Sequence, residues 1–278
     1  GLFSEVDGTA SFFVSDFTEV DNNVTRHIDD QISRINEWDV LILHYLGLDH
    51  IGHKGGPESV FMPNKQKEMD QIIKKLFDSM TEETLLVVVG DHGMNEVGNH
   101  GGSSAGETSA ATIFFSKKIK QLPKDDLYTQ KAPLQISPDF TYYRKISQYD
   151  IVPTLSALLN FPIPLNSLGV ILKEFLPLWS THDRDQVIFQ NVLQISNILN
   201  STYPGFMIIN ADDSMFCQSQ IDFNDVSELE TLKCMWWKVK ESGDFKDDKL
   251  VFDYLERSQK FLSQASSNYK TKEMSIGL

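Results

Sequence analysis

The sequence has only two cysteines, Cys217 and Cys234, among its 278 residues. Neither lies near the histidine-rich part of the chain, so a metal site built from cysteine thiolates is not expected. The two thiols can pair if the protein resides in an oxidising compartment. Two free, buried thiols are an equally compatible interpretation, and the sequence leaves the choice open.

Long apolar runs and an excess of positive charge are also missing. No run approaches the roughly 18 apolar residues that a transmembrane helix needs. No basic segment precedes an apolar core at the N-terminus, and the chain begins at Gly1, so we interpret it as a fragment or mature piece of a longer protein. The net charge of −14 argues against a nucleic-acid partner, because such proteins usually present a basic face.

The composition is that of a globular protein, with 41% apolar and 11% aromatic residues, enough for a substantial core. Two tripeptides, beginning at Asn23 and Asn200, match the acceptor sequence for N-glycosylation. We therefore predict glycosylation at these two asparagines. Such tripeptides arise often by chance, so together they are a mild indication of a lumenal location.

The order of predicted elements indicates an α/β fold. Strands are predicted over Ala10–Val14, Asp39–Leu46, Thr84–Val89 and Thr112–Ser116, and helices over Asn23–Glu37, Asn64–Met80, Ser147–Leu159 and Leu168–Trp179. The near-continuous apolar character of residues 40–43 is typical of a strand that is buried on both faces. Alternation of strands and helices predicts a mostly parallel sheet with helices on both faces.

The pattern changes near residue 180. Residues 181–278 have few glycines and prolines, and helices are predicted over Gln186–Leu199, Val226–Lys240 and Lys249–Ser263. We therefore predict a first domain over residues 1–180 and a mainly helical region over residues 181–278. The polar stretch Lys117–Phe140 within the first domain is predicted to be an exposed insertion.

Acidic and imidazole side chains follow two of the predicted strands. Asp49 and His53 come after the strand that ends at Leu46, and Asp91 and His92 come after the strand that ends at Val89. In open α/β sheets, ligands bind beyond the carboxyl ends of the strands. His100 follows in a glycine-rich loop, so these side chains are predicted to meet.

The candidate metal ligands are Asp49, His53, Asp91, His92 and His100. Zinc binds imidazole nitrogen and carboxylate oxygen, usually with four ligands, and five candidates exceed the need of one structural ion. They suit two metals about 3.5–4 Å apart, an arrangement that serves phosphoryl transfer. His50 either orients a ligand carboxylate or is a solvated loop residue.

A simpler interpretation is that each pair serves a turn. A single aspartate–histidine pair at a strand end is more often a turn that hydrogen-bonds the backbone. Four of the seven histidines, however, lie between residues 50 and 100 together with both aspartates. The joint occurrence favours metal binding.

The motifs Leu48–His53, Gly90–Met94 and Asn99–Gly102 resemble the metal-binding motifs of the alkaline phosphatase superfamily, and most closely those of the GPI ethanolamine phosphate transferase family. Further stretches that resemble this family are Phe12–His27, Gly101–Ser109, Tyr149–Leu155 and Phe161–Gly169. The resemblance covers about residues 1 to 180. It implies an alkaline-phosphatase-like fold, of which this chain would be the C-terminal part.

The resemblance also implies a site with two zinc ions. Asp49, His53 and His100 would hold one ion, and Asp91 and His92 would hold the other together with a further aspartate. A nucleophilic threonine would bridge them, and it is expected upstream of Gly1. Thr9, Thr18 and Thr25 do not lie in the expected context, so no catalytic nucleophile is assigned in this chain, and the fragment alone is expected to be inactive.

The expected activity is the transfer of phosphoethanolamine from phosphatidylethanolamine to the second mannose of the GPI glycolipid. The family works at the endoplasmic reticulum membrane with its catalytic domain in the lumen, held by segments that this chain does not contain, and a small membrane-protein subunit is a further expected partner. Residues 181–278 would lead towards such a membrane segment. Two alternatives remain: another phosphodiesterase or pyrophosphatase of the superfamily, and a non-catalytic fragment of the fold.

Overall fold

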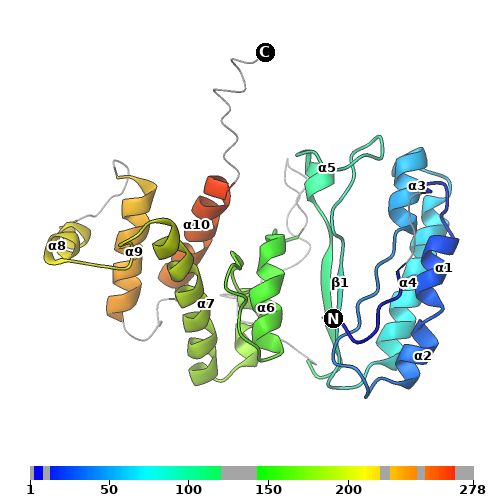
Figure 1. Ribbon diagram of the computed structural model, residues 1–278, viewed down its shortest axis with the longest axis horizontal. Helices are drawn as coiled ribbons and strands as arrows, with labels where there is room; N and C mark the ends of the chain where they lie inside the picture. The colour runs from blue at the N-terminus through cyan, green and yellow to red at the C-terminus, as the bar shows by residue number, and fades with distance from the viewer. Residues whose placement is uncertain (1–2, 9–12, 120–142, 220–225, 243–247, 267–278) are drawn as a thin grey trace, which may run out of the picture. The chain divides into compact units, whose positions relative to one another are not determined.

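A computed structural model describes residues 3–8, 13–119, 143–219, 226–242 and 248–266 of the chain (Figure 1). The chain divides into two compact units, Gly1–Gln121 and Leu122–Leu278. Most of the predicted strand Ala10–Val14 and of the predicted insertion Lys117–Phe140 lies outside the described residues. None of the helices in the described ranges is long and apolar enough to cross a membrane.

The first unit combines helices with a small sheet. Its elements, in chain order, are α1 (Glu19–Thr25), α2 (Ile28–Ser33), α3 (Gly47–Gly55), α4 (Met62–Ser79), β1 (Leu85–Val89), α5 (Ala105–Thr108) and β2 (Thr112–Ser116). Helix α4 confirms the prediction for Asn64–Met80. The predicted helix Asn23–Glu37 is wrong in extent, because the chain turns at Arg26 and His27 and divides it into α1 and α2.

Strands β1 and β2 lie where the sequence predicts them, but the predicted parallel sheet is not confirmed. The two strands pair antiparallel, with Leu85 opposite Ser116 and Val89 opposite Thr112. This pair is the sheet of the described residues. Antiparallel pairing tolerates one solvated face. Accordingly, Val89 at the end of β1 and Ile113 in β2 are each nearly half exposed.

The predicted strand Asp39–Leu46 is wrong in the part of the chain that the structure describes. Its side chains do alternate as in a strand: Leu41 and Leu43 are half-buried, whereas Val40 and Ile42 are 66% and 68% exposed. A strand also needs a neighbour with which to exchange backbone hydrogen bonds. The described residues contain no such neighbour for this stretch, and the predicted burial on both faces is also wrong, because Val40 and Ile42 face solvent.

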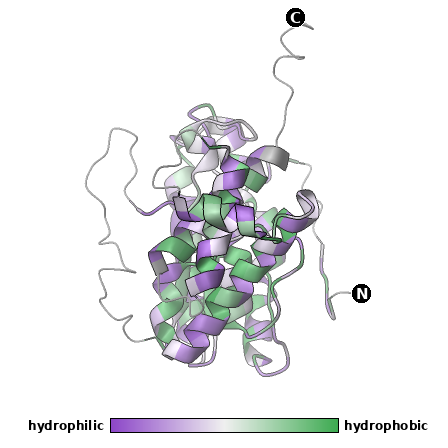
Figure 2. Cartoon of the chain, turned by 90° about the vertical axis from the view of Figure 1, so that its left-hand side faces the viewer, coloured by the Kyte–Doolittle hydropathy of each residue, from purple (hydrophilic) through white to green (hydrophobic). Residues whose placement is uncertain are grey.

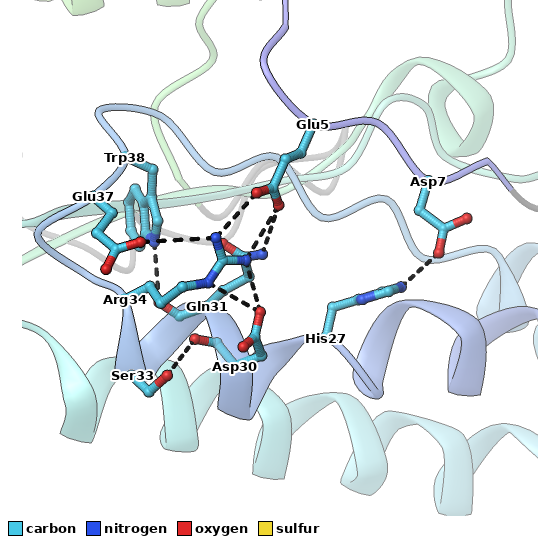
Figure 3. Close-up of polar contacts among 9 residues, drawn as sticks. All are labelled: Glu5, Asp7, His27, Asp30, Gln31, Ser33, Arg34, Glu37 and Trp38. Atoms are coloured by element: carbon cyan, nitrogen blue, oxygen red, sulfur yellow. Dashed lines mark hydrogen bonds and ion pairs between the residues drawn. The ribbon is translucent and has the colours of Figure 1, made fainter.

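Ion pairs attach the N-terminal segment, residues 3–8, to α1 and α2 (Figure 3). Arg34 of the α2 C-terminus contacts Glu5 at 3.0 Å and Asp30 at 2.7 Å. Asp7 accepts from Arg26 at 2.9 Å and lies 2.8 Å from a ring nitrogen of His27. The hydrogen bond from Arg34 holds the pKa of Glu5 below its ordinary value, and the hydrogen bond from Arg26 does the same for the pKa of Asp7.

The second unit is built from helices. Its described elements are η1 (Gln148–Asp150), α6 (Ile151–Leu158), η2 (Lys173–Leu178), α7 (Thr181–Thr202), α8 (Ala211–Ser219), α9 (Glu228–Ser242) and α10 (Asp248–Ser266). Helices occur at each of the positions predicted in this part of the chain, although the Leu168–Trp179 prediction shrinks to the short 3-10 turn η2. Helix α8 was not predicted.

Helices α7, α9 and α10 share one apolar core. Its fully buried members include Ile195 and Leu199 of α7, Leu232 of α9, and Leu255 of α10. Figure 2 shows polar residues interspersed with apolar ones along the helices, as expected for helices that bury one face only. Leu176 of η2 belongs to the same core. The two compact units divide between Gln121 and Leu122, not near residue 180. The domain boundary near residue 180 stays a prediction.

A disulfide joins Cys217 of α8 to Cys234 of α9, with the two Cα atoms 5.1 Å apart. Both cysteines are buried. The sequence left pairing and free thiols open, and the structure has them paired. The bond closes a loop between two helices whose connection includes residues 220–225, and so it fixes α8 against α9.

Candidate metal centre

The five predicted ligands come from three segments of the first unit. Helix α3 carries Asp49 and His53, the turn after β1 carries Asp91 and His92, and the glycine-rich loop that follows carries His100. Residues four apart on a helix lie on one face. The Asp49 and His53 side chains accordingly approach each other, with Oδ2 and Nε2 3.5 Å apart.

His100 contacts residues of both other segments, α3 and the turn after β1. Its Nε2 lies 3.5 Å from Oδ1 of Asp49. Its ring stacks on that of His92 with the centroids 3.7 Å apart, and the ring of His53 lies 5.0 Å away. One ligand atom each from Asp49, His92 and His100 can be chosen so that all lie within 4.8 Å of one another, a spacing that suits a single ion.

This grouping cuts across the one that the family resemblance implies. Asp49 and His100 were expected at one ion and His92 at the other, whereas the structure gathers the three of them. Asp91 is not part of this group of three: its side chain is 69% exposed, and its Oδ2 lies 3.5 Å from Nε2 of His92. The assignment of individual ligands to two ions stays a prediction.

The residues present fit a divalent cation. Asp49 Oδ1 is buried and has no hydrogen-bond partner among the described residues. A buried carboxylate oxygen without a partner is costly, and a bound cation would remove that cost. Nδ1 of His92 lies 3.1 Å from the carbonyl oxygen of Gly93, which can only accept. Nδ1 therefore carries the proton, and Nε2 keeps the lone pair that a metal requires.

Two glycines allow the segment after β1 to pack closely on α3. Gly98 has a φ of +82°, and a Cβ added there would lie 1.8 Å from the carbonyl oxygen of Gly52. A Cβ on Gly52 would in turn lie 2.1 Å from the sulfur of Met94. Position 98 requires glycine because of its positive φ and because of the nearby Gly52 carbonyl, and the loop that carries His100 approaches α3 there.

Asn95 and Glu107 hold the same loop from inside, and sequence reasoning missed both. Oδ1 of Asn95 accepts from the amides of Val97 and Asn99 at 3.1 and 2.9 Å. Glu107 accepts from the amides of Gly102 and Ser104, each at 3.2 Å. The signal for Glu107 was present, because Ser104 and Glu107 form a capping box at α5.

The electrostatics of Glu107 follow from these contacts. The hydrogen bond from the Ser104 side chain is the main reason that the pKa of Glu107 lies below its ordinary value, and the two backbone amides act in the same direction. Glu107 thus remains ionised and keeps accepting from the loop over a wide pH range. Its role is to shape the segment that presents His100.

The other predicted site residues make contacts of their own within each unit. His50 is buried, and its Nδ1 lies 2.7 Å from the carbonyl oxygen of Asp16, so it anchors α3 rather than contacting a ligand carboxylate through that nitrogen. Asn23 and Asn200 lie in α1 and α7 and are half-buried. Asn23 donates to the carbonyl of Glu19, and Asn200 accepts from the amide of Met207. Glycosylation at these two asparagines stays a prediction.

Comparison with known proteins places the cluster in context. The family described as type I phosphodiesterase / nucleotide pyrophosphatase matches residues 5–139. A protein of Yarrowia lipolytica named GPI ethanolamine phosphate transferase 2 is 47% identical over the whole chain, which spans 30% of that relative. A protein of the same name from Candida albicans is 59% identical over 72% of the chain. Another, from Debaryomyces hansenii, is 45% identical over the whole chain.

The chain spans less than a third of the length of these three relatives, from 22% to 30%. No solved structure matches it. The matched region of the phosphodiesterase family includes all five candidate metal ligands, and the relatives from Yarrowia lipolytica and Debaryomyces hansenii match the whole chain. The expected superfamily and family are therefore both confirmed: the chain belongs to the GPI ethanolamine phosphate transferase family, on an alkaline-phosphatase-like domain.

Proposed function

We propose that this chain is the metal-holding part of an enzyme that transfers phosphoethanolamine from phosphatidylethanolamine to the second mannose of the GPI glycolipid. The observation that carries the proposal is the convergence of Asp49, His92 and His100 from three segments of one unit. Relatives that match the entire chain are named GPI ethanolamine phosphate transferase 2, and this name supports the proposed type of reaction.

The proposed cofactor is zinc, with Asp49, His53 and His100 at one ion and Asp91 and His92 at the other. When bound, zinc ions lower the pKa of a hydroxyl nucleophile and neutralise charge on phosphoryl oxygens. Imidazole nitrogen with carboxylate oxygen is a ligand set that suits zinc. The side chains of Asp49, His53, His92 and His100 are 24% to 33% exposed and that of Asp91 is 69% exposed, which leaves the cluster accessible to a substrate phosphate.

This chain's own side chains would bind and orient. Asp49 would supply negative charge at the ion, and the Gly93 carbonyl would keep the His92 tautomer fixed. We propose that the nucleophilic threonine and a further aspartate come from outside these 278 residues. The chain covers only 30% and 22% of the length of two relatives, which supports this part of the proposal.

The proposed setting is the lumen of the endoplasmic reticulum, at the membrane. The Cys217–Cys234 disulfide supports it, because disulfides persist in oxidising compartments. The two candidate glycosylation sites, at Asn23 and Asn200, agree with it. Phosphatidylethanolamine, the GPI glycolipid and a small membrane-protein subunit are the proposed partners.

The competing function is hydrolysis, which the name of the matching phosphodiesterase family favours. The same metal centre would then deliver phosphoethanolamine to water. The full-length protein should be assayed with labelled phosphatidylethanolamine and a synthetic mannoside. Label on the mannoside that is lost in His53→Ala and Asp91→Ala variants supports the transferase, whereas release into water alone supports the hydrolase.

A further inference from the structure

Helix α3, which carries Asp49 and His53, has no N-cap of its own. Its N-cap residue Leu46 makes no side-chain capping hydrogen bond. The first amides of a helix have no partner within the helix and need an acceptor from elsewhere. Asp21 of α1 supplies it: Oδ1 accepts from the amides of Leu46 and Gly47 at 3.0 and 2.9 Å.

The other oxygen of Asp21 engages a buried cation. Oδ2 accepts from Nζ of Lys65 in α4 at 3.1 Å, and the two side chains are 0% and 5% exposed. A buried carboxylate is destabilising unless it is paired and hydrogen-bonded. Lys65 and the α3 amides together meet that need, so α1, α3 and α4 are joined at one point.

The fit at this point is tight. A Cβ added to Gly47 would lie 2.2 Å from Oδ2 of Asp21 and 3.0 Å from the carbonyl oxygen of Phe17. Three residues after Gly47, His50 makes a second attachment through its 2.7 Å contact with the Asp16 carbonyl. The start of the short helix is thus fixed in position and in rotation about its axis, and Asp49 follows Gly47 by two residues.

We propose that Asp21 and Lys65 are positioning residues of the metal centre. By fixing the start of α3, the pair sets the direction in which Asp49 and His53 point. The inference rests on the proposed metal centre, but it assigns a role to two residues that contact no ligand atom. No sequence signal suggested it, because Asp21, Leu46 and Lys65 come from separate elements.

The test uses substitutions that separate the cap from the charge. Asp21→Asn keeps one acceptor oxygen but sets an amide donor against the Lys65 ammonium. In Asp21→Asn/Lys65→Met the ammonium is gone, and the oxygen can face the α3 amides again. Asp21→Ala/Lys65→Met has no cap. Asp30→Asn, which removes an exposed, ion-paired carboxylate from α2, is the matched control.

Two readouts are taken on the 278-residue chain: its affinity for Co²⁺ and the visible absorption spectrum of the bound Co²⁺, which reports ligand geometry. Circular dichroism at the same temperature confirms that each variant is folded. Asp21→Asn should bind about tenfold more weakly and show a shifted spectrum, as changes to residues behind metal ligands commonly do. Asp21→Asn/Lys65→Met should recover most of both, Asp21→Ala/Lys65→Met should not, and Asp30→Asn should match the unsubstituted chain.

Equal cobalt affinity and unchanged spectra in all folded variants would overturn the proposal, since Asp21 would then support stability alone. If Asp21→Ala/Lys65→Met does not fold, recovery between Asp21→Asn and Asp21→Asn/Lys65→Met decides the question. If the unsubstituted chain does not bind cobalt, both the metal centre and the positioning role are overturned. Binding that ignores Asp21 would overturn only the latter.

Discussion

Nε2 of His100 lies 3.5 Å from Oδ1 of Asp49, although one residue belongs to a glycine-rich loop and the other to helix α3. Asp49 Oδ1 is also a buried carboxylate oxygen without a hydrogen-bond partner among the described residues. The contact therefore joins a carboxylate in need of a partner to an imidazole on a second segment. This geometry should determine how strongly substitution of each of the five predicted ligands weakens zinc binding.

We expect one tightly held zinc ion per chain. Asp49→Asn and His92→Ala should weaken zinc binding by more than the 10–100-fold that is typical of residues behind the ligands. Asp91→Asn should have a smaller effect, because this side chain is 69% exposed at the margin of the cluster. Competition with a zinc chelator measures the affinities, and His27→Ala is the control for removing a histidine. A larger loss for Asp91→Asn than for His92→Ala would contradict the grouping.

The isolated 278-residue chain should turn over neither phosphatidylethanolamine nor a generic phosphodiester. The candidate ligands bind and orient, but no side chain among them is assigned as the nucleophile. Product release is measured with zinc in excess, and the full-length protein serves as the positive control. Turnover by the isolated chain that disappears in His92→Ala would show that the chain contains its own nucleophile.

Gly98→Ala should weaken zinc binding more than Gly101→Ala does. Both glycines have a positive φ, so both substitutions strain the backbone. Only at position 98 does the new Cβ meet a backbone atom, 1.8 Å from the Gly52 carbonyl oxygen; at position 101 nothing lies within 4 Å. Zinc affinity and thermal melting are compared for the pair. Equal losses would indicate that backbone strain, not contact with α3, limits the loop.

Reduction of the Cys217–Cys234 disulfide should destabilise the second unit. The bond spans a sequence separation of 17 residues, for which the loop-closure entropy corresponds to about 3 kcal/mol of unfolding free energy. Guanidinium titration followed by tryptophan fluorescence measures the change in the Cys217→Ser/Cys234→Ser variant. Reductant should lower the midpoint of the unsubstituted chain towards that of the variant and leave the variant itself unaffected.

Acidification should release the N-terminal segment from α1 and α2. The pKa values of Glu5 and Asp7 are lowered in the folded chain by hydrogen bonds from Arg34 and Arg26. Groups with a lowered folded pKa contribute stability above their unfolded values, here 4.5 and 3.8, and the contribution is lost as the pH falls through the folded values. The attachment should therefore persist at neutral pH and weaken below about pH 4.5.

Hydrogen exchange of residues 3–8, corrected for intrinsic rates, measures the release. Glu5→Gln should show faster exchange already at pH 7, because it cannot form the charged contact with Arg34. Glu83→Gln, which removes a surface ion pair with Lys118 in the same unit, is the control. Exchange that does not respond to pH would mean that these pairs do not hold the segment.

Local patterns predicted the elements that depend on local information. β1 and β2 were found because buried apolar runs bounded by glycine and polar residues mark strands, and α4 because its apolar residues recur at helical spacing. Asp39–Leu46 was assigned wrongly because the same kind of apolar run also occurs in a segment that has no strand partner among the described residues. Sequence periodicity reports which side chains are covered, whereas strand pairing depends on the second chain segment.

The candidate ligands were predictable for a similar reason. Each aspartate–histidine group follows an apolar stretch within a few residues, which the sequence shows directly. Their grouping was not predictable, because the His92–His100 stack depends on how Gly98 packs against Gly52. Asp21 and Lys65 were missed altogether, since a cap supplied from another helix leaves no mark near the helix that it caps.

The apolar stretch at residues 40–43 has a consequence for the behaviour of the isolated chain in solution. Its exposed valine and isoleucine, Val40 and Ile42, sit on a segment that has no strand neighbour among the described residues. Segments of this kind are templates for pairing between molecules. The net charge of −14 opposes such association, so salt, by screening that repulsion, should make the chain self-associate.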